Sequence, residues 1–224
     1  MSSILHFSID HLISWPGFAE VDNQTASPSL PQVPAMQRRR MSPLCKASLH
    51  AAFGLPPECG DAPLVFASRY GDIGRSIELL TQLSEGEALS PTQFSLSVHN
   101  AIAALHGILS NHRGQYTAIS AGGETIEAAF CEALGMLADG ASAVRLIACD
   151  APLPEPYHAF ESAAEPLLAW GCVIRAADRG PRLSLASTDA CGPDHGHPWR
   201  FLCGNASAHR HQCGNQTWLW QRHG

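Results

Sequence analysis

One region of this chain, residues 90–150, constrains the fold more than any other, because its apolar periodicity switches repeatedly between helix and strand. We expect a helix over 101–109, a strand over 116–119, a helix over 125–137 and a strand over 143–149. A strand, a helix and a strand in that order imply a right-handed crossover between parallel strands. The mostly apolar run of the last strand is typical of a sheet covered on both faces. The chain is therefore predicted to have an α/β fold.

A glycine pair marks the bend between the 116–119 strand and the helix that follows it. Gly122 and Gly123 permit a sharp turn there, because glycine adopts backbone conformations that other residues avoid. A bend that opens a helix can hold an anion on its free N–H groups. However, Glu124 and Glu127 complement the helix dipole themselves, which argues against a bound phosphate. The simplest interpretation is a structural turn.

The same signals predict further elements along the chain. We expect other strands over 4–9 and 64–68, other helices over 42–53 and 74–85, and another core segment over 167–174. Ser42 before Pro43 is a pairing typical of a helix N-terminus. A turn is expected over 13–17, and Gly114 is expected to take the left-handed conformation that ends the 101–109 helix.

Composition agrees with a globular chain that forms one core. The sequence has 224 residues, of which 45% are hydrophobic, and a net charge of −6. That charge argues against nucleic acid as a partner. Three consecutive arginines, Arg38, Arg39 and Arg40, are a local exception, and they would suit binding to an acidic carrier protein or another acidic partner. The simpler explanation is that they are solvated residues at the start of the next helix.

The cysteines and the N-terminus together favour a cytoplasmic protein. Cys131, Cys149 and Cys172 lie in core-like runs, as buried free thiols do. The N-terminus lacks the basic start and apolar run of a secretory signal. No apolar stretch is long enough to span a bilayer. We therefore expect a reducing compartment, the cytoplasm.

Several motifs together resemble those of a known family. They are Arg38-Arg39-Arg40-Met41-Ser42, Ser68-Arg69-Tyr70-Gly71, Ser97-Val98-His99-Asn100, Arg113-Gly114 and Ser120-Ala121-Gly122-Gly123. The chain resembles the short β-ketoacyl synthase-like proteins, N-terminal domain only, that are encoded with aryl polyene and related fatty-acid-like pathways and are often described as chain-length-factor-like. The resemblance is strong over 38–157 and weak over 180–214. It implies half of a thiolase-like ketosynthase fold, with a mixed sheet packed by helices.

The resemblance also locates the position of the family's reactive cysteine. When the motifs are aligned without gaps from Gly114 and from Gly140, that position falls on or near Gly123, and a small shift places it at Ser120. Neither residue is a cysteine, and Cys131 lies in the body of the following helix. The family also uses a second, pseudo-symmetric half with two histidines, for which 224 residues leave no room. No catalytic residue, cofactor or metal is expected, and condensation by this chain alone is not expected.

A partner subunit is the next implication of the resemblance. In the thiolase-like fold, the strand before the nucleophile pairs antiparallel with its counterpart in the partner, and an uncharged edge strand invites such pairing. The expected partner is a full-length ketosynthase, and an acyl carrier protein is a second candidate. This chain would then help shape acyl or polyene chain length. We expect the contact at Gln115, Tyr116, Thr117, Ala118, Ile119 and Ser120, with Phe94, His99 and Asn100 lining the contact or a pocket beside it.

An independent hydrolase or acyltransferase is an alternative that the residues leave open. Ser120 follows a strand, as a nucleophilic serine can, but Ala118 stands where a G-x-S-x-G elbow needs glycine. A serine at a strand end is more often a hydrogen-bonding turn residue. His99 and His106 are more often cap or core residues than catalytic bases.

The C-terminal part of the chain differs in composition from the rest. We expect residues 1–179 to form the ketosynthase-like half domain and residues 180–224 to form an irregular Cys/His-rich tail, in which Trp218, Leu219 and Trp220 alternate as in a final strand. Cysteine and histidine are zinc ligands, so a metal-binding tail is a further alternative. Its spacing matches no familiar zinc module. The tail residues of these two types are Cys191, His195, His197, Cys203, His209, His211 and Cys213.

Overall fold

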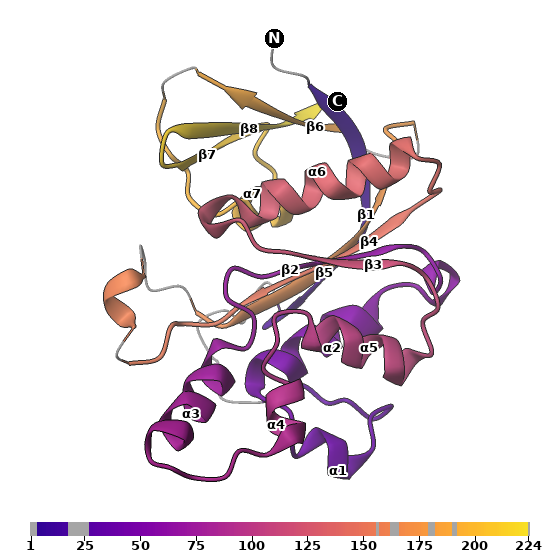
Figure 1. Ribbon diagram of the computed structural model, residues 1–224. Coiled ribbons are helices and arrows are strands. Elements are labelled where there is room, and N and C mark those ends of the chain that lie inside the picture. The colour runs from indigo at the N-terminus through magenta and orange to yellow at the C-terminus, as the bar shows by residue number, and fades with distance from the viewer. Residues whose placement is uncertain are drawn as a thin grey trace.

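The structure, a computed structural model, describes residues 4–17, 27–155, 157–161, 166–178, 182–189 and 192–223. Eight strands form one mixed sheet in the order β3-β2-β4-β5-β1-β6-β8-β7 (Figure 1). Strand β2 pairs parallel with β3 and β4, and the other pairs are antiparallel. The strands are β1 Leu5–Trp15, β2 Leu64–Ala67, β3 Tyr116–Ile119, β4 Val144–Asp150, β5 Leu168–Arg175, β6 Arg182–Thr188, β7 Ala208–Cys213 and β8 Gln216–His223.

Helices cover both faces of the sheet. Helix α6 lies on one face, and α2 and α5 lie on the other (Figure 1). None of the helices in the described ranges is long and apolar enough to cross a membrane. The helices are α1 Ala35–Arg38, α2 Pro43–Gly54, α3 Ile73–Ser84, α4 Pro91–Ser95, α5 Ala101–Ser110, α6 Thr125–Ala138 and α7 Trp199–Cys203, and short 3-10 turns occupy Pro57–Cys59, Gly122–Glu124 and His158–Phe160.

The two faces of the central strands enter two separate hydrophobic cores. In β2, Val65 and Ala67 pack on the α6 side, whereas Leu64 and Phe66 pack on the α2 side. This alternation follows from the period of two in a strand. Because both faces are covered, the strand is apolar throughout, as expected for a buried parallel strand. The predicted α/β fold, with β3 and β4 parallel and joined through α6, is confirmed.

The predicted start of α2 is also confirmed. Pro43 is the first helical residue, and the Ser42 hydroxyl accepts a hydrogen bond of 3.0 Å from the Cys45 N–H. This bond satisfies one of the N–H groups that a helix leaves without a partner in its first turn.

Three local predictions differ from the structure. Asn111, with φ of 52°, takes the left-handed position that ends α5, and Gly114 does not; asparagine tolerates this conformation because its short polar side chain bonds locally. Strand β1 continues through the turn expected over 13–17, because an irregularity after Asp10 lets it pair with β5 as far as Trp15. The apolar sequence of residues 101–109 suits a buried helix, but α5 buries Ala101, Ile102, Ala103 and His106 and leaves Ile108 77% exposed.

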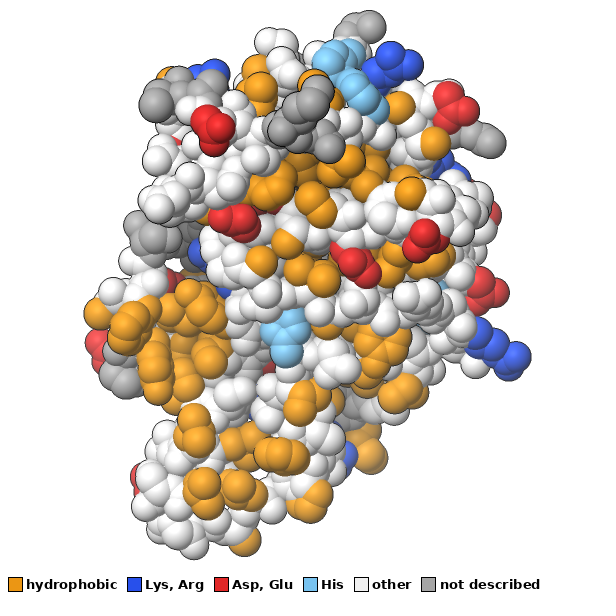
Figure 2. Space-filling view, turned by 45° about the horizontal axis from the view of Figure 1, so that its top comes forward, with side chains coloured by type: hydrophobic (Ala, Val, Ile, Leu, Met, Phe, Trp, Pro, Cys, Tyr) orange, Lys and Arg blue, Asp and Glu red, His pale blue; other side chains and the backbone are white. Residues whose placement is uncertain are grey.

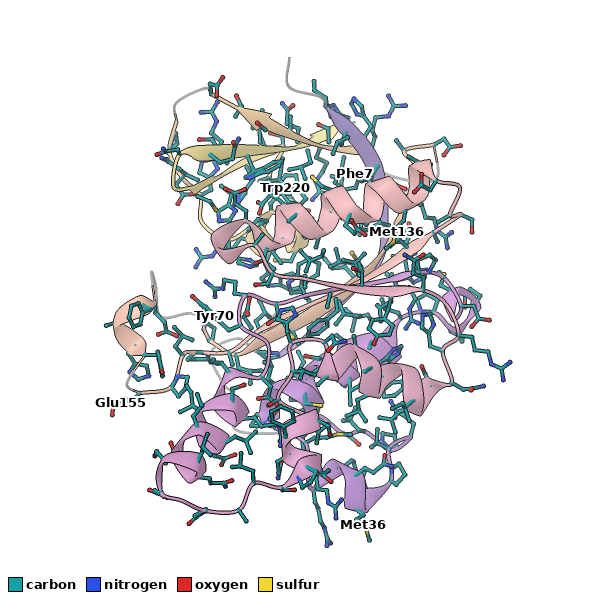
Figure 3. All side chains as sticks on the ribbon, viewed as in Figure 1. Phe7, Met36, Tyr70, Met136, Glu155 and Trp220 are labelled. Atoms are coloured by element: carbon teal, nitrogen blue, oxygen red, sulfur yellow. The ribbon has the colours of Figure 1, made fainter. Side chains whose placement is uncertain are left out.

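The C-terminal segment contains more regular structure than the irregular tail expected over 180–224. Strand β6 pairs with β1, and β8 lies between β6 and β7, so the described part of this segment belongs to the main sheet. Trp220 is fully buried and packs on Phe130, with ring centroids 4.9 Å apart. Figure 3 shows Trp220 beside Phe7 next to α6. Cys191 lies outside the described residues.

Candidate functional site

Strand β3 lies at one end of the sheet. Of the strands that the structure describes, it pairs only with β2, from Leu64 opposite Tyr116 to Ala67 opposite Ile119. The three residues 117–119 are partly buried, whereas Gln115, Tyr116 and Ser120 are exposed. The carbonyl groups of Gln115 and Ile119 accept bonds from the β2 side. Because successive residues of a strand direct their backbone groups to opposite sides, the N–H and C=O groups of residues 116 and 118 face the open edge.

The residues expected beside β3 have different environments. His99 Nε2 lies 2.8 Å from the carbonyl oxygen of Ser68, in the loop after β2. Asn100 lies within 3.5 Å of the hydroxyl of Tyr116, so it does reach β3. Phe94, on α4, is 60% exposed. None of Phe94, His99 and Asn100 lines the pocket at the bend after β3.

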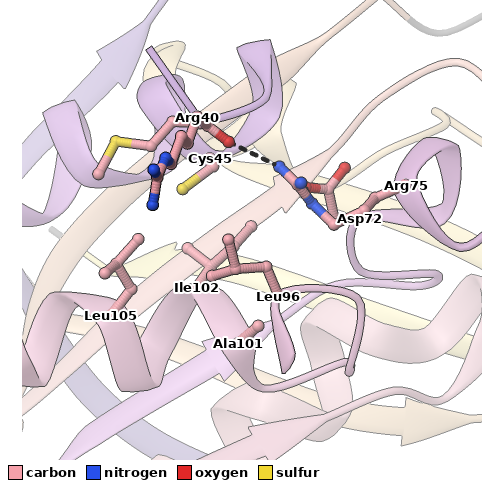
Figure 4. Close-up of a pocket in the computed structure, with 9 residues that line it drawn as sticks. Arg40, Cys45, Asp72, Arg75, Leu96, Ala101, Ile102 and Leu105 are labelled. Carbon is pink, nitrogen blue, oxygen red and sulfur yellow. Dashed lines mark hydrogen bonds and ion pairs between the residues drawn. The ribbon is translucent and has the colours of Figure 1, made fainter. Parts of the chain in front are cut away.

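A buried ion pair positions the segment that carries Phe94. Arg75 Nε lies 3.3 Å from the carboxylate of Asp72, and its guanidinium donates to the carbonyl oxygen of Arg40 at 3.1 Å (Figure 4). The same guanidinium also donates to Gln93 in α4. A cavity of about 10 Å³ lies beside this group, too small for a ligand. The cluster therefore serves to hold α3 and α4 in place.

The bend after β3 is held by backbone conformation and by side-chain hydrogen bonds. Gly122 has φ of +57°, the left-handed region that favours glycine. The Thr125 hydroxyl accepts from the Ala121 N–H at 3.0 Å and donates to the Gly122 carbonyl at 2.7 Å. The Ser120 hydroxyl donates to the Arg69 carbonyl at 2.8 Å. Ser120 thus acts as a turn residue, and among the described residues its hydroxyl bonds to no histidine.

An open pocket of about 520 Å³ lies against this bend. Residues at or just after the carboxyl ends of the parallel strands β2, β3 and β4 line it on one side, and residues of β7 and its turn into β8 line it on the other. Arg69 and Asp150 line it and are joined by an ion pair of 3.3 Å. The other lining residues are Ala121, Gly122, Gly123, Glu124, Thr125, Ile126, Asp194, Gly196, His197, His211, Gln212, Cys213 and Gly214.

A thiol from β7 occupies the space in front of Gly123. A Cβ atom placed on Gly123 would lie 3.1 Å from the Cys213 sulfur, which is closer than ordinary van der Waals contact. Gly123, like Ser120, is one of the two positions that the sequence resemblance predicts for the family's cysteine. The structure therefore brings a sulfur to this part of the bend from the far end of the chain.

Cys213 belongs to a cluster of three side chains. Its sulfur lies 3.4 Å from Nε2 and 3.7 Å from Nδ1 of His211. His211 Nδ1 lies 2.8 Å from Oε1 of Glu127, which has no exposed surface. The same oxygen accepts a hydrogen bond of 3.0 Å from Trp220 Nε1. We call Cys213, His211 and Glu127 the thiol triad.

The charge state of the pocket depends on its histidines. Burial alone would lower the pKa of His211, but the hydrogen bonds with Cys213 and Glu127 outweigh it and raise this pKa to about 10. His211 is therefore a cation at neutral pH. Burial, together with the charge of His211, lowers the pKa of His197 to about 3 and keeps that ring neutral. Burial also lowers the pKa of His209.

Sequence reasoning noted the members of the thiol triad but did not combine them. It assigned Glu127 to the helix dipole, and it placed His211 and Cys213 in an irregular tail. A signal for the strand was present, because residues 209, 211 and 213 alternate and so share one face of β7.

The metal-binding alternative finds no support in the structure. The described part of the chain contains no group of three or more His, Cys, Asp or Glu that could hold a metal ion.

Comparison with known proteins identifies the family. The family described as "Beta-ketoacyl synthase, N-terminal domain" matches residues 13–221. The chain belongs to this family. Among proteins with curated descriptions, none matches the chain significantly.

Solved structures of ketosynthases share the fold of this family member. A structure described as a ketosynthase (ApeO) in complex with its chain length factor (ApeC), from Xenorhabdus doucetiae, matches with a TM-score of 0.78 and 21% identity, over 97% of this chain and 100% of the matched chain. The ishigamide ketosynthase/chain length factor matches with a TM-score of 0.55 and 13% identity, over 84% and 67%. A β-ketoacyl synthase from Burkholderia phymatum STM815 matches with a TM-score of 0.54 and 10% identity, over 87% and 66%. The predicted thiolase-like ketosynthase fold is confirmed.

Proposed function

We propose that this chain is a ketosynthase-like subunit that pairs with a full-length β-ketoacyl synthase. In this role it performs no condensation of its own and helps shape the length of the acyl or polyene product. The open outer edge of β3 is the observation that carries the proposal. Its family membership supports this role, as does its likeness over 97% of its length to a chain from a ketosynthase–chain length factor complex.

The outer edge of β3 is suited to pairing with a strand of the partner. None of the residues 116–119 is charged, so nothing on the strand repels a second strand. The backbone groups of residues 116 and 118 point away from β2 and lack a partner strand among the described residues. A partner strand would satisfy them. The proposed contact residues are Gln115, Tyr116, Thr117, Ala118, Ile119 and Ser120.

Exposed apolar side chains extend the proposed contact beyond the strand. Tyr116 is 40% exposed, and Val98, in the loop that leads to α5, is 45% exposed. Phe94 is more exposed still, and Asn100 links this loop to Tyr116. Figure 2 shows that hydrophobic side chains gather in patches on the face that it displays. Apolar surface of this kind is typical of surfaces that bind other proteins.

An acyl carrier protein is the second proposed partner. Arg39 and Arg40 are exposed, and the carbonyl of Leu30 accepts a hydrogen bond of 2.9 Å from Arg38, which positions the basic run. A basic surface of this kind favours the approach of an acidic protein.

Copurification with a ketosynthase tests the main proposal. The tagged chain is co-expressed with the ketosynthase encoded nearest to it, and the retained ketosynthase is quantified. We expect it to be retained by the wild-type chain and lost with Tyr116→Arg, because a charge would then be desolvated at the paired edge. Leu80→Arg, on α3, is the matched control: Leu80 is also an exposed apolar residue, at 58%. Equal retention by Tyr116→Arg and wild type would contradict the placement at β3.

A further inference from the structure

We propose that a second pocket, between the C-terminal ends of α2 and α5, binds a small organic monocarboxylate whose charged group contacts the buried Arg145. This site goes beyond the proposed subunit role, because pairing through the outer edge of β3 makes no use of it. The inference rests on a buried cation without a carboxylate partner, on unpaired imidazole nitrogens beside it, and on apolar side chains in the same pocket.

The pocket is open and has a volume of about 490 Å³, which is within the range of small-molecule sites. Its walls come from the last turns of α2 and α5, from the segments that precede β2 and β3, and from Arg145 near the start of β4. It therefore lies toward the amino ends of the parallel strands, whereas residues at their carboxyl ends line the pocket at the bend. We call it the arginine pocket.

Arg145 is a buried cation that forms no ion pair with any carboxylate in the described ranges. Its guanidinium donates to the carbonyl oxygens of Ala52, at 3.0 Å, and of Gly60, at 3.3 Å, which are uncharged acceptors. The carbonyl end of α2 offsets part of the charge. Burial still lowers the pKa of Arg145, and its Nε has no hydrogen-bond partner among the described residues. A carboxylate is the acceptor that suits such a guanidinium, because bonds between these two planar groups are charge-assisted.

Two imidazole rings at the pocket also have a nitrogen atom without a partner. His106 is 2% exposed, and its Nε2 lies 3.4 Å from the Arg145 guanidinium, which can only donate. Burial, followed by the charge of Arg145, lowers the pKa of His106 to about 4, so the neutral ring carries its proton on Nδ1. That N–H group and Nε2 of His112 are buried, and neither has a partner in the part of the chain that the structure describes. Buried donors without acceptors are costly, and an anion in the pocket would supply an acceptor.

The unpaired atoms lie just beneath the surface of the pocket. Nε of Arg145, Nδ1 of His106 and Nε2 of His112 are all buried, so a ligand reaches them only when neighbouring side chains shift. Phe53 and His112, which line the pocket, are only half-buried. Side chains at a partly exposed position can change rotamer without disturbing the core.

The rest of the lining selects the class of anion. Phe53 and Leu55 supply apolar surface to the pocket. Two exposed acids, Glu58 and Asp61, also line it and would repel a ligand that carries several negative charges. A single carboxylate on an apolar body therefore fits the arginine pocket better than a phosphate does.

Binding of hexanoate tests this inference. The full-length chain, with its histidines isotopically labelled, is titrated with hexanoate, and the ring protons of His106 are followed by NMR. We expect saturable shifts with a dissociation constant on the order of 1 mM. Hexanol, which lacks the charge, should bind at least roughly tenfold more weakly, because it loses a hydrogen bond between charged groups. Inorganic phosphate should also bind more weakly than hexanoate.

Two kinds of variant separate the charge of the pocket from the stability of the fold. Arg145→Met removes the cation and should abolish the hexanoate shifts. Because Arg145 also holds the end of α2, a second variant leaves it in place. Ser110 is exposed at the end of α5 and lines the pocket. Ser110→Glu should weaken hexanoate binding roughly threefold, whereas the uncharged control Ser110→Gln should bind like wild type.

Four results would overturn the inference. The absence of saturable shifts in folded wild-type protein would show that the pocket binds no carboxylate. Equal binding of hexanol and hexanoate would show an apolar pocket without an anion site, and tighter binding of phosphate would reject the monocarboxylate class. Equal binding by folded Ser110→Glu and Ser110→Gln would place the ligand elsewhere. None of these results bears on pairing with a ketosynthase, which copurification measures independently.

Discussion

Glu127 is a carboxylate with no exposed surface, and its contacts determine the charge of the pocket. The hydrogen bonds of His211 with Cys213 and Glu127 overcome burial and raise the pKa of His211 to about 10. Because the folded pKa lies above the ordinary value of 6.5, this group stabilises the fold fully below pH 6.5, and the stabilisation is lost as the pH rises through about 10.

Replacing Glu127 should change the titration of His211 directly. In Glu127→Gln, the imidazolium loses its buried counter-ion, so the pKa of His211 should fall from about 10 toward or below 6.5. The chemical shifts of the His211 ring protons, in NMR spectra recorded from pH 5 to pH 11, measure this pKa. The other titratable groups around His211 are Cys213, His197, His209 and Asp194. An unchanged titration would show that the carboxylate does not hold the proton on His211.

The buried His106 should give the opposite dependence of folding stability on pH. Burial, followed by the charges of Arg145 and His112, lowers the pKa of His106 to about 4. The unfolded chain binds a proton there near pH 6.5, while the folded chain does not until about pH 4. Stability should therefore fall as the pH drops from 6.5 to 4. His106→Gln should flatten this slope in urea unfolding series, and an unchanged slope would contradict the assignment.

At the scale of elements, β3, the bend and α6 are the most predictable part of the chain, and the proposed partner contact lies on β3. Their signals are local: glycines at the turn, β-branched and aromatic residues in the strand, and a helical period after it. Alternate residues of β3 direct their backbone N–H and C=O groups toward β2 and away from it, so the groups of residues 116 and 118 face the outer edge.

Removing one outward N–H group should weaken pairing without breaking the sheet. Ala118→Pro deletes an outward donor, and proline is tolerated on edge strands. The loss of one hydrogen bond, about 1 kcal/mol, should weaken ketosynthase binding at least roughly fivefold. Ala118→Ser keeps the N–H group and should bind like wild type. Surface plasmon resonance measures the affinity of both variants for the ketosynthase, and circular dichroism checks that both are folded. Full affinity in a folded Ala118→Pro chain would mean that the partner contacts another surface.

The C-terminal hairpin was harder to predict, for a physical reason. Strands β7 and β8 are rich in polar residues and histidines, and they join the main sheet through β6, which pairs with β1 far away in sequence. His211 and Glu127 are 84 residues apart, so no local pattern brings them together. Their meeting depends on the order of the sheet and on the packing of α6 against it. For the same reason the thiol triad became visible only in three dimensions.

At the scale of the whole molecule, the sheet order gives the chain an edge and a pocket that lie close together. Strand β3 ends the sheet on one side, and the bend that follows it forms one wall of the pocket at the carboxyl ends of β2, β3 and β4. Open α/β sheets commonly bind ligands at this end of their parallel strands. A partner that pairs with β3 would therefore sit next to the pocket.

The measurement that tests the central claim most directly is the mass of the species obtained by co-expression with the nearest-encoded ketosynthase. Size-exclusion chromatography with light scattering gives that mass without reference to shape. The pairing proposed here predicts one complex containing equal numbers of the two chains, present with wild type and absent with Tyr116→Arg. Separate elution of this chain and the ketosynthase, with both chains folded, would contradict it.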